Sequence, residues 1–176
     1  MKFARIHLKN VSRSFAFCIE RLPEPFRTQV AYGYLLCRIL DTIEDSTWED
    51  SSLQILKFQE FDAALEGRSI LPANWSEEFP QNIPEGERVL LLQAHEVLSR
   101  FYSFSEEVQA IMREVVVSMS HGMLRFVRQK QNGVFRLHSL FEVNKYCFFV
   151  AGVVGEMLTR LFVKMQCAAV EMKSNS

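Results

Sequence analysis

The segment from Tyr34 to Asp45 reads Tyr-Leu-Leu-Cys-Arg-Ile-Leu-Asp-Thr-Ile-Glu-Asp and ends in a group of carboxylates. At about 100° of rotation per residue, a helix over this segment gathers its polar side chains into one narrow stripe. The stripe consists of Tyr34, Arg38, Asp41 and Asp45, and Glu44 lies beside it. Carboxylates one helical turn apart lie on the same face, so their oxygens can converge on a single divalent cation. Without such a cation between them, the two like charges repel each other.

Magnesium is the ion that suits Asp41 and Asp45, because it takes oxygen ligands and keeps several waters. It is commonly held by one or two carboxylates together with phosphate oxygens of a substrate. Arg38, one turn before the acidic pair, is placed to meet such a phosphate. Spacing alone leaves an alternative open, an amphipathic helix whose polar stripe faces water and whose Arg38 pairs with Asp41.

The rest of the chain predicts long helices to position this stripe. Only seven glycines and five prolines interrupt it, and the prolines cluster in two places. The expected helices span 12–22, 26–45, 53–65, 85–102, 106–129 and 140 to about 165. A capping box of Ser139 and Glu142 marks the start of the last helix, and the break before that helix begins at Gln131. The tail from Lys173 is expected to fray. We therefore expect an all-α fold with residues 1–176 as one domain.

Composition excludes several classes of protein. The 176 residues are 48% hydrophobic, which is typical of a folded globular domain. With 20 Lys and Arg against 21 Asp and Glu, there is no positive field for nucleic acid, and no nucleic-acid partner is expected. The four scattered cysteines and the lack of a signal segment favour the cytoplasm. The longest uncharged apolar run, Tyr146 to Gly155, falls short of the roughly 20 residues of a membrane span, which leaves only peripheral membrane contact open.

Three segments in a fixed order resemble the squalene/phytoene synthase family of head-to-head prenyl transferases. They are Ser12-Arg13-Ser14-Phe15, the stripe from Tyr34 to Asp45, and Tyr-Cys-Phe-Phe-Val-Ala-Gly-Val-Val-Gly from Tyr146 to Gly155. The resemblance covers nearly all of the chain, up to about Phe162. It implies an isoprenoid-synthase-like helical bundle whose central cavity takes two prenyl diphosphates.

The resemblance also implies roles for individual residues. The magnesium ligands would be Asp41, Glu44 and Asp45. Contacts with diphosphate would come from Ser12, Arg13, Ser14, Tyr34 and Arg38. Tyr146 would lie near the reacting carbons, where its hydroxyl steers the reaction or relays a proton; the alternative is a hydroxyl in water.

Matched positions on several helices suggest a lining for the prenyl chain. Phe15 and Met123 are such positions, although buried apolar residues in helices are more often core. Val150, Ala151 and Gly152 belong to the same set, because small side chains on the last helix permit close packing or leave room for a prenyl tail.

The family pattern also includes a second aspartate-rich motif, which this chain does not reach. After Phe162 only residues 163–176 remain, and Glu171 is their one carboxylate side chain. We therefore expect a bundle truncated at its C-terminal end, as a fragment, a shortened member, or a chain completed by another subunit. The helices that remain would expose apolar surface and favour association.

The leading hypothesis is a magnesium-dependent transferase that condenses two prenyl diphosphates head-to-head and releases pyrophosphate. Farnesyl diphosphate is the expected substrate, with squalene, dehydrosqualene or phytoene as the product and NADPH needed if the product is squalene. Little or no turnover is expected from the 176 residues alone. Two alternatives stay open: a non-catalytic family member that acts as an assembly or scaffold protein, and a helical diphosphate hydrolase.

Overall fold

The structure is a computed structural model that describes residues 1–130 and 136–174. Over these residues the secondary structure is helical and contains no strand, so the all-α prediction is confirmed. The α-helices are α1 (Lys2–Val11), α2 (Arg13–Ile19), α3 (Phe26–Asp45), α4 (Ser51–Leu65), α5 (Glu85–Leu92), α6 (Ala94–Tyr102), α7 (Glu106–Val127), α8 (Leu140–Cys147) and α9 (Val153–Ser174). A 3-10 turn, η1 (Trp75–Glu78), and a π-helical turn, η2 (Phe148–Gly152), complete the list.

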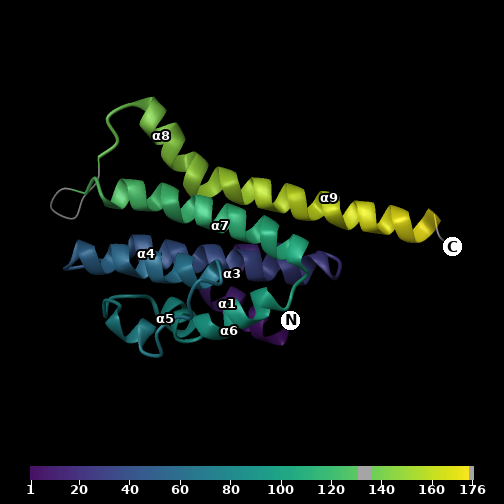
Figure 1. Ribbon diagram of the computed structural model, residues 1–176, viewed down its shortest axis with the longest axis horizontal. Coiled ribbons are helices and arrows are strands. Elements are labelled where there is room, and N and C mark those ends of the chain that lie inside the picture. The colour runs from purple at the N-terminus through teal and green to yellow at the C-terminus, as the bar shows by residue number, and fades with distance from the viewer. Residues whose placement is uncertain (131–135, 175–176) are drawn as a thin grey trace.

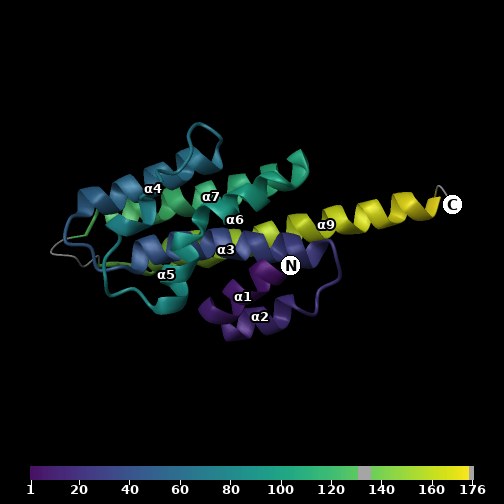
Figure 2. The same ribbon diagram turned by 90° about the horizontal axis from the view of Figure 1, so that it is seen from below.

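Helix α3 is the central element of the bundle. It packs against α1, α2, α4, α5, α6, α7 and α9, and Figures 1 and 2 show it between the layer of α7 and α9 and the layer of α1 and α2. Its apolar side chains are buried, with Leu35, Ile39 and Ile43 fully inaccessible to solvent. Its bounds match the predicted range, because Pro25 precedes its first residue and Ser46 leaves helical geometry after its last. The helix that carries the acidic residues is therefore anchored in the bundle by its buried apolar side chains.

The N-terminal region contains one helix more than the sequence predicted. The charged residues Arg5 and Lys9 obscure an amphipathic pattern in which Ala4, His7 and Leu8 form the buried face of α1. The backbone of Ser12 is extended, so the chain turns there, and the Ser12 hydroxyl accepts a hydrogen bond from the Phe15 N–H at 3.4 Å. Ser12 thus caps α2 rather than beginning the first helix.

The predicted helix over 85–102 is two helices, α5 and α6. Gln93 lies between them with φ −111° and ψ 18°. Its side-chain Oε1 lies 2.8 Å from Nε2 of His7 on α1. The break thus accompanies a contact that is distant in sequence, and no glycine or proline marks it.

The last helix begins where the capping box predicted. The Glu142 N–H donates to the Ser139 hydroxyl at 3.2 Å, and the Glu142 carboxylate accepts from the His138 N–H at 2.6 Å. The helix then changes pitch at η2 and continues as α9 to Ser174, past the predicted end near residue 165. Of the tail from Lys173 that is expected to fray, Lys173 and Ser174 are helical, and residues 175–176 lie outside the described residues. The predicted break at Gln131 lies outside the described residues.

By length and composition alone, the helical stretch Leu140–Cys167 could cross a membrane. The mean hydropathy of its most apolar window is 1.6, and 17% of that window is buried in the fold. The prediction that no stretch is long enough is therefore corrected: it counted only the uncharged run, whereas a span tolerates isolated charges. Part of this stretch serves the fold, since Val153, Met157 and Leu161 are buried.

Candidate active site

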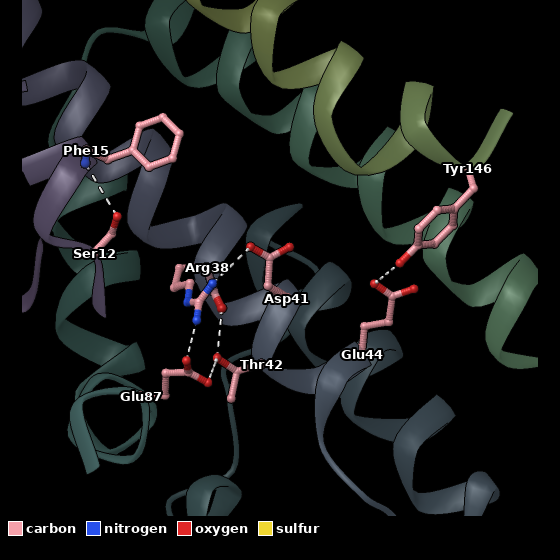
Figure 3. A network of polar contacts seen from close by, with 8 residues as sticks. All are labelled: Ser12, Phe15, Arg38, Asp41, Thr42, Glu44, Glu87 and Tyr146. Atoms are coloured by element: carbon pink, nitrogen blue, oxygen red, sulfur yellow. Dashed lines mark hydrogen bonds and ion pairs between the residues drawn. The ribbon is translucent and has the colours of Figure 1, made fainter. Parts of the chain in front are cut away.

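The polar edge of α3 is organised around Arg38. Its guanidinium forms an ion pair and hydrogen bond with Glu87 on α5, and its other Nη lies 3.8 Å from a carboxylate oxygen of Asp41 (Figure 3). The Thr42 hydroxyl lies 2.9 Å from the Arg38 carbonyl oxygen and 3.2 Å from the second Glu87 oxygen. Arg38 therefore lies between carboxylates from two helices, and Glu87 is a site residue that sequence reasoning missed.

Glu44 faces a different part of the bundle from Asp41. The Tyr146 hydroxyl on α8 donates to a Glu44 carboxylate oxygen at 3.3 Å, as Figure 3 shows. The other Glu44 oxygen is buried and has no hydrogen-bond partner among the described residues. Lys130 lies nearby, with its Nζ 3.4 Å from the Glu44 carbonyl oxygen. Tyr146 thus contacts the acidic end of α3, whereas the alternative placed its hydroxyl in water.

The carboxyl groups of this region resist ionisation. The pKa of Asp41 is raised to about 7, mainly by burial; Arg38 lowers it, and the charges of Asp45 and Glu87 add to the rise. Burial also raises the pKa of Glu44 to about 7, with Asp45 and Asp41 adding to the effect. Asp45 is more exposed, yet burial and the Glu87 charge raise its pKa as well. Added positive charge at this edge would therefore stabilise the ionised carboxylates.

The carboxylates can be tested against the magnesium site that the sequence predicted. Among the described residues, no group of three or more His, Cys, Asp or Glu side chains is close enough to hold a metal ion. The donors are nonetheless hard carboxylate oxygens, and one buried oxygen of Glu44 lacks a partner. Because magnesium is commonly bound by one or two carboxylates, with water and phosphate as its other ligands, these residues fit it as part of a shared site.

An apolar cavity begins one helical turn before Arg38. It has a volume of about 500 Å³ and lies between α2, α3 and α9. Its walls include Phe15, Leu22, Tyr34, Met157, Leu158 and Phe162. The rings of Phe15 and Tyr34 are in contact, with centroids 5.1 Å apart. Tyr34 therefore joins the apolar cavity to the polar edge of the same helix.

The other predicted site residues are distributed over several surfaces. Ser12 and Arg13 line a separate cavity of about 470 Å³ together with Glu85 of α5, and Ser14 is exposed. Asp45 lines a small cavity of about 220 Å³ with Glu87.

The remaining positions expected to line the prenyl pocket differ in burial. Met123 is fully buried in the hydrophobic core, so the core interpretation left open for it is the one observed. Val150 is half-buried, and Ala151 and Gly152 are exposed on η2. None of these four positions lines the apolar cavity between α2, α3 and α9.

Comparison with known proteins decides the family. The family model described as squalene/phytoene synthase matches residues 8–173. The chain belongs to the squalene/phytoene synthase family. The relatives include squalene synthase ERG9 of Candida albicans, 36% identical over 89% of this chain, and squalene synthase ERG9 of Saccharomyces cerevisiae, 32% identical over 96%. Squalene synthase of Solanum lycopersicum is 29% identical over 91% of the chain.

Solved structures of the family show the same helical fold. The structure of TcSQS with the ligand E5700 superposes with a TM-score of 0.77 and 26% sequence identity. It covers 94% of this chain, which corresponds to 44% of the TcSQS chain. The chain likewise spans about a third of the length of the squalene synthases that it matches, 34% for the Candida albicans protein and 36% for the yeast protein. The isoprenoid-synthase-like bundle predicted from the sequence is therefore confirmed.

Proposed function

We propose that this squalene/phytoene synthase relative contributes the first acidic helix of a magnesium-dependent prenyl transferase. The reaction would condense two prenyl diphosphates head-to-head and release pyrophosphate, with farnesyl diphosphate as the substrate. One observation carries the proposal. The same edge of α3 carries carboxyl groups that resist ionisation and, closer to the start of the helix, Tyr34, which lines the apolar cavity. That arrangement suits a ligand with an anionic head and a hydrocarbon tail.

The proposed roles follow from where each side chain lies. Asp41 and Asp45 would hold magnesium, and Glu44, which faces Tyr146, would have to turn toward them to become a third ligand. When bound, the ion supplies positive charge that stabilises pyrophosphate as a leaving group. Arg38 would contact the diphosphate as a fixed cation. The walls around Phe15 and Met157 would take the prenyl chain and exclude water.

Tyr146 is proposed as a protonated hydrogen-bond donor at the acidic end of α3. Burial, together with Glu44, raises the pKa of its phenol. The hydroxyl therefore keeps its proton at neutral pH and donates a hydrogen bond to a Glu44 carboxylate oxygen. The tyrosine can thereby orient Glu44.

The product and the location of the protein are finer parts of the same proposal. Squalene, dehydrosqualene and phytoene are the candidate products, and NADPH is required only if the product is squalene. A cytoplasmic location, with the apolar stretch Leu140–Cys167 in contact with a membrane surface, also belongs to the proposal.

Binding of farnesyl diphosphate to the full chain tests the function directly. Isothermal titration with and without magnesium chloride should show binding that depends on the metal. Asp41→Asn should weaken it by about tenfold or more, because a ligand to the ion loses its charge. Glu49→Gln, which changes an exposed carboxylate just past the end of α3, is the control and should bind like the wild type.

Two results would contradict the proposed function. One is equal affinity in the presence and absence of magnesium. The other is equal affinity of the Asp41→Asn chain and the wild type. Pyrophosphate release in the same samples measures turnover separately from binding.

A further inference from the structure

Glu87 is placed so that both of its carboxylate oxygens are engaged. One oxygen pairs with a terminal nitrogen of the Arg38 guanidinium. The other lies 3.2 Å from the Thr42 hydroxyl, which is itself 2.9 Å from the Arg38 carbonyl oxygen. The Glu87 side chain is only 12% exposed. This carboxylate thus contacts α3 at two points one helical turn apart, the Arg38 guanidinium and the Thr42 hydroxyl.

The backbone that carries Glu87 is fixed by contact with α1. Gly86, the preceding residue, lies so close to α1 that an added Cβ would sit 2.5 Å from the Asn10 carbonyl oxygen. The Glu87 N–H also bonds to the Pro84 carbonyl oxygen at 3.0 Å. A close backbone approach that only glycine allows therefore sets where the Glu87 side chain starts.

We propose that Glu87 is a positioning residue, which orders the Arg38 guanidinium so that Arg38 can meet the anionic head of the ligand. This proposal rests on the proposed function and adds a residue to it. A free arginine side chain loses rotamer freedom when it binds an anion, and a partner that orders it beforehand removes that cost. Glu87 thereby acts through Arg38 rather than by touching the ligand.

The direction in which removal of Glu87 changes anion binding separates a positioning role from a general effect of its charge. Glu87 is negative, so its charge alone repels a diphosphate, and its removal would strengthen binding of an anion. A positioning residue has the opposite effect, because its removal releases Arg38. A metal ligand would also weaken binding when removed, but it would do so whether or not Arg38 is present.

Inorganic pyrophosphate with magnesium chloride is the probe for the full chain, measured by isothermal titration. Glu87→Gln should weaken its binding by about tenfold, as expected for loss of one charged hydrogen bond. Arg38→Gln should weaken binding as well, and adding Glu87→Gln to Arg38→Gln should weaken it no further, because with Arg38 gone only the repulsion between Glu87 and the anion is removed. Glu96→Gln is the matched control, since Glu96 also pairs with an arginine, Arg100, but at the surface.

Unchanged or tighter binding by Glu87→Gln overturns the proposal. It is equally overturned if Glu87→Gln weakens binding just as much in the Arg38→Gln background. Glu87→Asp keeps the charge and should retain part of the wild-type affinity; a loss as large as that of Glu87→Gln counts against positioning by charge. Circular dichroism of every variant confirms that it is folded.

A measurement without ligand separates the two proposals. The Arg38 side-chain Nε–H resonance, assigned by its absence from Arg38→Gln, should report an ordered side chain in the wild type and a mobile one in Glu87→Gln. If Arg38 is equally ordered in both, the positioning role is wrong. If the wild type fails to bind magnesium pyrophosphate while Arg38 order depends on Glu87, the proposed function fails and the positioning role stands.

Discussion

Asp62 on α4 is a buried carboxylate outside the candidate active site. Its side chain is 7% exposed, and the Ser120 hydroxyl on α7 donates to one of its oxygens at 2.8 Å. The other oxygen has no hydrogen-bond partner among the described residues. Burial raises the pKa of Asp62 to about 6, against the lowering effects of Ser120 and His121. Ionisation of this group therefore opposes folding.

This shift predicts a pH dependence of stability with a definite sign. Between about pH 4 and pH 6 the folded chain keeps a proton on Asp62 that the unfolded chain has released. The contribution of Asp62 to the free energy of unfolding thus falls as pH rises through that window, by roughly 3 kcal/mol, and is flat above it. Asp62→Asn, whose amide oxygen still accepts from Ser120, should remove this part of the slope. Urea unfolding of both chains across the window measures it, and parallel profiles would show the prediction to be wrong.

Asp41 predicts a coupling between magnesium and thermal stability. Because its raised pKa reflects a poorly solvated charge, Asp41→Asn should raise the melting temperature at about pH 8 without metal by a few degrees. The wild type should gain stability when magnesium is added, since a ligand that binds the folded state stabilises it. The variant should gain much less. Scanning calorimetry with and without magnesium checks both effects, and an equal gain in the two chains would exclude Asp41 as a ligand.

At the scale of elements, local signals predicted α3 and most of its neighbours. The prolines before it predicted where it begins, and in the structure Ser46, whose backbone is extended, ends it at Asp45 as expected. The separation of α5 from α6 had no such signal, since the break at Gln93 accompanies a hydrogen bond to His7, 86 residues away. Helix α1 was missed because its buried face is short and includes a histidine. The spacing of apolar residues along the sequence does not reveal helix boundaries that depend on contacts between distant residues.

The same distinction explains what the sequence revealed of the candidate site. The stripe of Arg38, Asp41 and Asp45 follows from helical spacing, and the Arg38–Asp41 pair is present in the structure. Glu87 is 49 residues from Arg38 and belongs to another helix, so no local pattern connects them. Lys130, 86 residues from Glu44, was missed for the same reason. The family resemblance supplied Tyr146, and only the fold shows that it contacts Glu44.

Two glycines on neighbouring helices predict opposite effects of the same substitution. A Cβ on Gly122 of α7 would lie 2.2 Å from Cγ of Phe149, so that ring must move away from α7. A Cβ on Gly155 of α9 meets nothing within 4 Å. Gly122→Ala should therefore lower the free energy of unfolding by about 1–3 kcal/mol. Gly155→Ala should raise it by up to about 1 kcal/mol, because alanine is the better helix former. Urea unfolding of both variants tests the pair, and a stabilising Gly122→Ala would contradict the packing described for η2.

At the scale of the whole molecule, apolar side chains lie on the outside of the bundle. Figure 1 shows α9 running beyond the end of α7. Phe162 on α9 is 43% exposed and Val163 is 52% exposed, and on α2 Phe15 and Phe17 are more than half exposed. Phe162 and Phe15 border the same apolar cavity. Exposed apolar surface of this kind favours association.

We therefore predict that the chain self-associates through the face formed by α2 and α9. Sedimentation velocity should show a sedimentation coefficient that rises with protein concentration, because burying these side chains between copies removes apolar surface from water. Phe162→Glu combined with Val163→Glu should abolish the rise, since association would then bury charge. Ile70→Glu is the control: Ile70 is 88% exposed and lies in the loop after α4, outside both α2 and α9. A coefficient that does not depend on concentration in the wild type, or equal effects of the control and the α9 variant, would show that this face is not an association surface.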